Sequence, residues 1–142
     1  MPTDGLLVTQ LSQVISQATA PAFLLGAVAA FVSVLIGRLN RIVDRSLMLV
    51  ALENKDDIKV GGDILRLQRR AKLMSKAIEF AVLAGIATTF LVIVAFGSAA
   101  LGLTHAYGAA ALFVVALCFF AAALICLWLE IKIAIGGLDG FL

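Results

Sequence analysis

Three long runs without a charged side chain constrain the fold of this chain more than any other feature. They cover residues 18–37, 80–103 and 109–129. Each run has about the 20 residues that an α-helix needs to cross a hydrocarbon core of roughly 30 Å. Backbone groups must be hydrogen-bonded within each segment there, and period-two alternation is absent, which argues against a barrel. The sequence therefore predicts an all-α integral membrane protein with three transmembrane helices.

The composition supports a membrane protein built as one domain. Of the 142 residues, 63% are hydrophobic and only 14% are charged, whereas about a quarter of residues are charged in soluble domains. Residues 1–142 are expected to form a single membrane domain, because the chain is short. Three helices cannot enclose a large cavity, so a wide pore would need several copies.

The distribution of positive charge predicts the orientation. Ten of the eleven Lys and Arg residues lie between Arg38 and Lys76, and none precedes Arg38. Cytoplasmic loops carry such an excess, so the basic loop is expected in the cytoplasm, the N-terminus outside and the C-terminus inside. Trp128 and Tyr107 then fall at the inner and outer interfaces, where aromatic rings prefer to lie. No basic segment precedes the first apolar run, so it is expected to be retained and not cleaved as a signal peptide.

The pattern around the first two runs predicts a helical hairpin. Residues 1–19 suggest an outer amphipathic segment, and Pro21 suits the first turn of a new helix covering residues 20–37. Helical spacing continues after Gly37, breaks between residues 54 and 62, and resumes after Asp63 as a helix that leads into the second span at 80–103. Residues 38–79 would thus form a basic cytoplasmic hairpin that extends spans one and two. After span three at 109–129, residues 130–142 are expected to form a cytoplasmic tail, in which Gly136 and Gly137 indicate a helix stop.

The apolar stripes of this hairpin need a partner. The arms may pack on each other with Asp44 facing Arg69, Arg70 and Lys72, lie on the inner leaflet, or contact hairpins of other subunits. Basic residues beside anionic lipid each contribute about 1 kcal/mol of attraction, although such charges also follow from topology alone. The candidate lipid or partner surface consists of Arg38, Arg41, Arg45, Arg66, Arg69, Arg70, Lys72 and Lys76.

Small residues four apart mark candidate helix-packing faces. They are Ala22, Gly26 and Ala30 in span one and Ala77, Ala81 and Gly85 around the start of span two. Small side chains allow helix backbones to approach closely in lipid. The two faces are expected to meet each other, within one chain or between subunits.

Polar residues near the spans favour a structural role over transport. No charge is expected deep in the bilayer, which counts against a pump or transporter. Glu79 and Glu130 are expected at the cytoplasmic ends, in interfacial ion pairs with Lys76 and Lys132 respectively. Four hydroxyl groups, which often bond back to helix carbonyls, could line a narrow path if several subunits met: Ser33, Thr88, Thr89 and Ser98.

No constellation in the sequence indicates catalysis or a cofactor. Nucleophile elbows, zinc-protease motifs and phosphate loops are absent, and His105 has no Cys, Asp or Glu beside it to complete a metal shell. Cys118 and Cys126 lie in an apolar run and are interpreted as packing residues. Aromatic residues are not interleaved with the basic ones, which argues against nucleic-acid binding. The sequence therefore predicts no enzyme, no cofactor, no metal and no nucleic acid.

Four segments carry a resemblance to a known family. They are Val14–Pro21 before span one, Arg38–Arg45 at its exit, Arg69–Met74 before span two and Leu129–Ile131 at the end of span three. With these segments the chain resembles a bacterial three-span membrane family catalogued as domain of unknown function 2721. The resemblance implies the three-span plan and a bacterial inner membrane. It implies no activity, and no functional residue is carried over.

Three functions remain compatible with these features. The first is a non-enzymatic protein that acts through self-association or as an accessory or scaffold subunit, with another membrane protein as partner and membrane lipids around it. The second is a homo-oligomeric ion channel with its pore between subunits, lined by hydroxyls and apolar constrictions. The third is a sensor of anionic lipid, which would bind through the basic hairpin.

Overall fold

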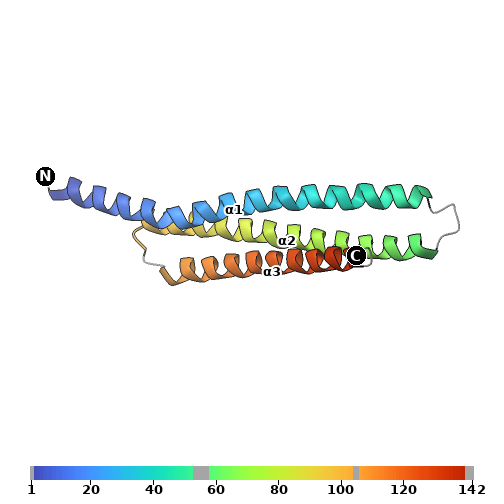
Figure 1. Cartoon of the computed structure of the whole chain (residues 1–142). Coiled ribbons are helices and arrows are strands. Elements are labelled where there is room, and N and C mark those ends of the chain that lie inside the picture. The colour runs from blue at the N-terminus through green and yellow to red at the C-terminus, as the bar shows by residue number, and fades with distance from the viewer. Residues whose placement is uncertain (1, 53–57, 104–105, 140–142) are drawn as a thin grey trace.

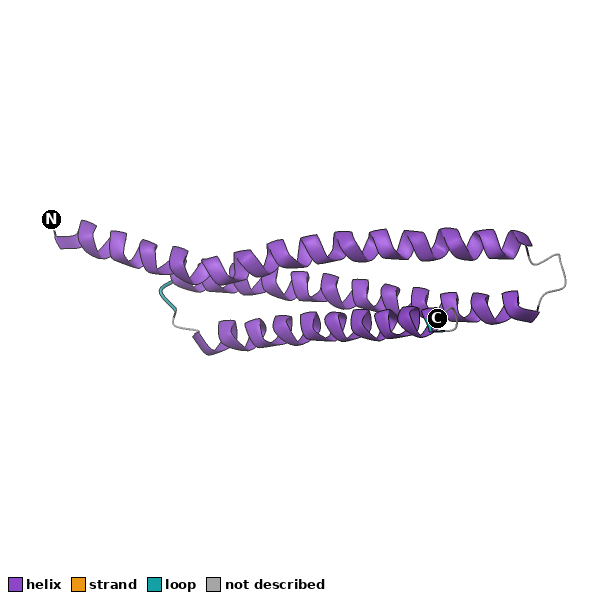
Figure 2. Cartoon of the chain, in the orientation of Figure 1, coloured by secondary structure: helices purple, strands orange, loops and turns teal. Residues whose placement is uncertain are grey.

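A computed structural model describes residues 2–52, 58–103 and 106–139, and it contains three long helices. They are α1 (Pro2–Leu52), α2 (Ile58–Ala100) and α3 (Ala106–Leu138), which run side by side with α1 antiparallel to α2 and α2 antiparallel to α3 (Figure 1). Within these described ranges, the residues outside the helices are the short loop after α2 (Figure 2) and Asp139 after α3. Each helix contains a segment long and apolar enough to cross a membrane. The predicted all-α plan with three spans is confirmed.

Buried residues recur every seven positions on the outer two helices. On α1 they are Pro21, Val28, Leu35 and Ile42, and on α3 they are Ala116, Ala123 and Glu130. A seven-residue repeat keeps one face of a helix turned toward its neighbour when the two cross at about 20°. The buried positions of α1 and α3 thus have the spacing of a coiled coil, and one of them holds a carboxylate.

Helix α2 lies between the other two and provides the core with small side chains. Its fully buried residues follow one another at alternating intervals of three and four, from Met74 through Ala77, Ala81 and Ala84 to Thr88. Both α1 and α3 pack extensively on α2, and they contact each other far less. Alanine at these positions lets both neighbours approach the α2 backbone closely.

Helix α1 is continuous, so the predicted break between an outer segment at 1–19 and a new helix at Pro21 is wrong. Pro21 lies inside α1 and is buried, and α1 changes direction within its N-terminal half (Figure 1). Proline removes one backbone hydrogen bond and bends a helix without having to end it. The N-terminal part of α1 projects past the other helices (Figure 1), and it exposes Leu6, Leu7 and Leu11.

The predicted helix boundaries at the glycine pairs are also wrong. Helix α2 begins at Ile58, so Gly61 and Gly62 are helical and Asp63 is not a cap; residues 54–57 of the predicted turn lie outside the described residues. Helix α3 continues through Gly136 and Gly137 to Leu138, so residues 130–138 of the predicted tail are helical. A glycine costs a helix about 1 kcal/mol, which tertiary packing readily offsets.

Candidate functional site

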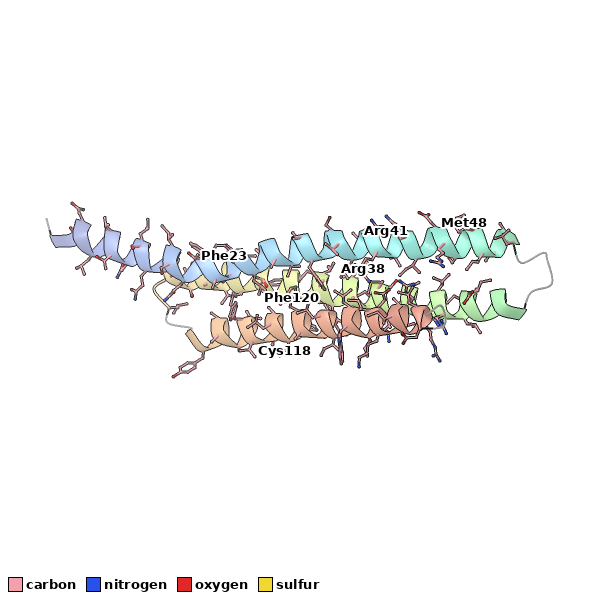
Figure 3. All side chains as sticks on the ribbon, in the orientation of Figure 1. Phe23, Arg38, Arg41, Met48, Cys118 and Phe120 are labelled. Carbon is pink, nitrogen blue, oxygen red and sulfur yellow. The ribbon has the colours of Figure 1, made fainter. Side chains whose placement is uncertain are left out.

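A carboxylate buried among the three helices forms the most distinctive polar site of the molecule. The side chain of Glu130 on α3 has no exposed surface. Its Oε2 accepts a hydrogen bond from Nη2 of Arg38 on α1 at 2.9 Å. Its Oε1 lies 2.8 Å from both Nε and Nη2 of Arg70 on α2. Each helix thus contributes one residue to an Arg38–Glu130–Arg70 cluster, and Figure 3 shows Arg38 between α1 and the other helices.

The helix repeats explain why these three residues meet. Glu130 follows Ala116 and Ala123 at seven-residue intervals on the buried face of α3. Arg38 comes three residues after the buried Leu35, and Arg70 comes three residues after the buried Leu67. Residues three and four apart lie on the same face of a helix. All three side chains therefore point toward the bundle axis at one level.

The cluster satisfies its buried charge while retaining contact with water. The Arg38 and Arg70 side chains are 37% and 22% exposed, so only the carboxylate is fully removed from solvent. Among the described residues, no buried side-chain nitrogen or oxygen lacks a hydrogen-bond partner. Two guanidinium groups around one carboxylate leave one excess positive charge. Removing one partner of such a buried pair is strongly destabilising, so the cluster acts as a clamp on the three helices.

The ion pairs predicted from sequence neighbours are wrong in their partners. Residues two apart on a helix point about 200° away from each other, and Lys132 accordingly lies over the Trp128 ring, 4.0 Å from its centroid, and not on Glu130. No described residue forms a salt bridge with Lys76, Glu79 or Asp44, all of which are exposed. The acidic partner of Arg70 is Glu130, and not Asp44.

The other basic residues of the candidate surface are exposed around this cluster. They are Arg41 and Arg45 on α1 and Arg66, Arg69, Lys72 and Lys76 on α2. The Arg66 guanidinium lies against the end of α3, with Nη1 3.0 Å from the place a Cβ on Gly137 would take. The last carbonyls of a helix carry partial negative charge and attract such cations. Arg66 thus adds a side-chain contact between α2 and α3 beyond the clamp.

The two candidate packing faces differ in their environment. On α2, Ala77 and Ala81 are fully buried, and a Cβ on Gly85 would lie 3.6 Å from Val28 Cγ1. On α1, Ala22, Gly26 and Ala30 are exposed. The predicted contact between these two faces is therefore absent from the described part of one chain. Val28, in the seven-residue repeat of α1, is the residue that packs near Gly85.

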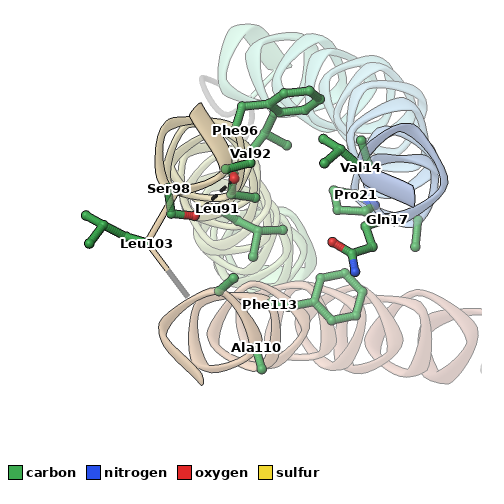
Figure 4. A pocket seen from close by; sticks show the side chains of 15 residues that line it. Val14, Gln17, Pro21, Leu91, Val92, Phe96, Ser98, Leu103, Ala110 and Phe113 are labelled. Carbon is green, nitrogen blue, oxygen red and sulfur yellow. Dashed lines mark hydrogen bonds between the residues drawn. The ribbon is translucent and has the colours of Figure 1, made fainter. Parts of the chain in front are cut away.

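The far end of the bundle contains an apolar pocket between all three helices. It has a volume of about 460 Å³ and is lined by Val14, Pro21, Leu91, Phe96 and Phe113 among others (Figure 4). Among the described residues that line it, the polar side chains are those of Gln17 and Ser98. Ser98 bonds to the carbonyl of Ala95. The pocket offers space for an apolar chain, and none of its described lining residues carries a charge that could orient a ligand.

Three of the four hydroxyls considered for a polar path, those of Thr88, Thr89 and Ser98, are bonded within their own helix. Thr88 and Thr89 donate to the carbonyls four residues earlier, at 2.7 and 2.9 Å. Such internal bonds leave a hydroxyl less available for an ion or a chain of water.

Thiols and carboxylates do not gather into a reactive site in the described ranges. Cys118 and Cys126 are free thiols on α3, the first exposed and the second packed against the core. Within residues 2–52, 58–103 and 106–139, no three His, Cys, Asp or Glu side chains lie close enough together to hold a metal ion. His105 lies outside these ranges. The one buried carboxylate is committed to two guanidinium groups, so its geometry suits structural locking.

Comparison with known proteins gives a family for the chain. Neither the curated proteins nor the solved structures contain a match. A family model matches residues 18–139, which includes the clamp, both arms of the hairpin and all three apolar runs. The chain, a protein with three helices able to span a membrane, belongs to the family described as protein of unknown function DUF2721.

Proposed function

We propose that this chain is a non-enzymatic protein of the bacterial inner membrane that works through association, as an oligomer or as an accessory subunit of a larger assembly. The arms of α1 and α2 beyond the clamp would be its cytoplasmic contact surface. The observation that carries the proposal is the exposure of large apolar side chains on these arms. Leu47, Met48 and Leu52 on α1 and Leu65 on α2 are 58 to 68% exposed.

The position of these side chains supports a protein partner. The arms of α1 and α2 continue past the C-terminal end of α3 (Figure 1), so α3 does not cover their tips. Arg41 and Met48 lie on the outer side of α1 (Figure 3), and both are exposed. Apolar side chains beside exposed arginines are typical of interface cores with a polar rim. Outside the hydrocarbon core, such a surface is stabilised when a partner removes it from water.

The hydroxyl geometry makes the channel function the weaker candidate. A pore between subunits would need polar groups free to face it, and Thr88, Thr89 and Ser98 each bond to a carbonyl of α2. Binding of anionic lipid through the basic surface remains compatible with the exposed arginines and lysines, and the experiment below separates it from protein association.

The test changes the apolar residues of the arms and keeps their charges. Leu47, Met48 and Leu65 would be replaced together by Gln, and the purified chain in nanodiscs would be analysed by native mass spectrometry. We expect the substituted chain to lose associated proteins that the unsubstituted chain retains. A matched control replaces Leu6, Leu7 and Leu11, which are equally exposed at the opposite end of α1, and should change nothing.

Two outcomes would contradict the proposal. One is an unchanged set of associated proteins and copies after the arm substitutions. The other is an unsubstituted chain that carries no protein but binds anionic vesicles in a salt-sensitive way, which would favour the lipid sensor.

A further inference from the structure

Two exposed charged residues of α2, Lys76 and Glu79, precede the charge-free run of their own helix but lie level with the charge-free run of α3. The ring of Phe80 stacks on that of Phe119, with centroids 6.4 Å apart. Phe119 lies in the middle of the charge-free run of α3. Glu79 directly precedes Phe80 and therefore lies at the level of an apolar segment of α3.

Distances along α2 agree with this register. Arg70 meets Glu130, which stands one residue past the end of the charge-free run of α3. Lys76 and Glu79 are six and nine residues further along α2, or about 9 and 13 Å deeper at 1.5 Å per residue. The contact of Val28 with the Gly85 position places α1 in the same register, because residue 79 is then level with residues just before Gly37. In this register Lys76 and Glu79 of α2 lie level with the charge-free runs of α1 and α3.

Both side chains point away from the chain's own core. Lys76 and Glu79 are exposed, and neither forms a salt bridge with any described residue. They belong to an exposed stripe on the side of α2 opposite the buried Ala77, Ala81 and Ala84. The stripe continues at intervals of four and three through Leu83, Ile86, Phe90 and Ile93, which are 42 to 60% exposed. A charged pair thus interrupts a surface that is otherwise apolar.

We infer that a second copy of this chain packs on the exposed stripe of α2, so that Lys76 of each copy pairs with Glu79 of the other. The argument is charge complementarity. Two copies inserted in the same direction are related by a two-fold axis along the membrane normal, and their α2 helices run parallel. Lys76 and Glu79 differ in height by three residues, about 4.5 Å, which a lysine side chain spans. One interface then forms two identical ion pairs.

The arrangement removes both charges from lipid, and each ion pair is electrically neutral. Unpaired charges within the hydrocarbon are expensive, and they usually face a protein interior or a partner charge. The three-four spacing of the stripe also suits packing of two parallel helices at about 20°. This inference goes beyond the proposed function, because it concerns a face of α2 at membrane depth and not the arms.

Charge reversal in two differently tagged copies tests the pairing. Lys76→Glu alone and Glu79→Lys alone place like charges opposite each other in every homodimer. We expect each to reduce the capture of one tagged copy by the other at least about tenfold. Co-expression of a Lys76→Glu copy with a Glu79→Lys copy restores both pairs in the heterodimer, so capture should return to the wild-type level. A pair formed within one chain would not be rescued in this way, so absence of rescue overturns the inference.

Matched controls keep the test independent of misfolding and of the arms. Lys132→Glu on α3 reverses an exposed lysine outside the stripe and should leave capture unchanged. The arm variant with Gln at Leu47, Met48 and Leu65 should also retain capture through α2, so failure of the proposed function and failure of this inference are distinguishable. Unchanged capture after either stripe reversal would overturn the inference.

Cross-linking supplies a second measurement on the folded protein. In a chain with Cys118→Ser and Cys126→Ala, the substitution Ile86→Cys places a thiol on the stripe, where oxidation should join two copies through a disulfide. Val115→Cys is the control, since this exposed residue of α3 lies at about the same depth by the Phe80–Phe119 register. Equal or greater cross-linking at residue 115 than at residue 86 would contradict an interface on α2.

Discussion

The two ends of the bundle hold the same three helices together in different ways. At the hairpin end, Glu130 and two arginines fix the helices through three N–O contacts of 2.8 to 2.9 Å. At the opposite end, the helices surround a pocket of about 460 Å³ whose described lining residues are uncharged and mostly apolar. The seven-residue repeats continue through both ends, so the difference lies in the side chains at equivalent positions and not in the helix geometry.

This difference has a physical consequence for specificity. Apolar contacts between helices compete with equally apolar lipid, and they tolerate small shifts and gaps. A buried carboxylate with two guanidinium partners has few acceptable geometries, because any shift leaves a charge unpaired in a medium of low dielectric. The clamp therefore sets the register of the three helices, and the apolar end follows it.

The largest expected effect comes from removing the carboxylate of the clamp. Glu130→Gln leaves Arg38 and Arg70 without a charged partner, and we expect a loss of about 3 kcal/mol in the free energy of unfolding. Titration with a denaturing detergent measures this. The control Asp44→Asn neutralises an exposed carboxylate outside any salt bridge of the described chain. Equal stability of the two variants would show that the clamp does not hold the bundle.

The two arginines should differ in their contributions. Arg70 presents both Nε and Nη2 to Glu130 and is the less exposed of the two, whereas Arg38 presents Nη2 alone. We expect Arg70→Met to cost about 2 kcal/mol and Arg38→Met about 1 kcal/mol, because each hydrogen bond to a charged group contributes to stability. The same titration measures both. A larger loss for Arg38→Met than for Arg70→Met would show that the main contact of Glu130 is with α1.

A larger side chain should destabilise the tightly packed middle of the bundle more than the end that contains the pocket. Ala81→Leu inserts three carbons at a fully buried position between helices, and we expect a loss of about 1.5 kcal/mol. Ala95→Leu adds the same atoms beside the pocket and should cost little or increase stability. Thermal unfolding in nanodiscs compares the two variants. Similar losses in both would mean that the pocket is already filled.

The smallest expected effect concerns the glycine pair near the end of α3. Gly136→Ala meets no neighbouring atom, and we expect a gain of about 0.5 kcal/mol from reduced backbone entropy of the unfolded chain. At Gly137 a Cβ would lie 3.0 Å from Arg66 Nη1, so the guanidinium must shift and the gain should be smaller. The difference between the two melting temperatures measures the contact. A larger gain at residue 137 would exclude a role for Arg66 there.

The position of each membrane-spanning segment was predictable from the sequence, and the contacts between the helices were not. Hydropathy and the lack of charge identified all three spans, because the requirement to cross about 30 Å of hydrocarbon applies to each segment alone. The helix boundaries predicted at proline and glycine residues were wrong. Pro21, Gly61 and Gly136 lie inside helices, since packing of a long helix against its neighbours outweighs a local cost of a few kcal/mol.

Glu130 shows which signal was available for the candidate site and was missed. Its spacing of seven and fourteen residues from Ala123 and Ala116 places it on the buried face of α3. A search for the repeat would have indicated a buried carboxylate that needs a partner. Proximity in sequence indicated Lys132 instead, which lies on another side of the helix and contacts Trp128.

Sequence determined the spans and the concentration of basic residues at one end, because both depend on composition within a segment. The relative register of the helices arose only in the packed bundle. That register brings Arg38, Glu130 and Arg70 together, and it carries Lys76 and Glu79 to the apolar levels of their neighbours. No local pattern contains this information, since sliding one helix by a turn leaves its own hydropathy unchanged but alters every contact that it makes.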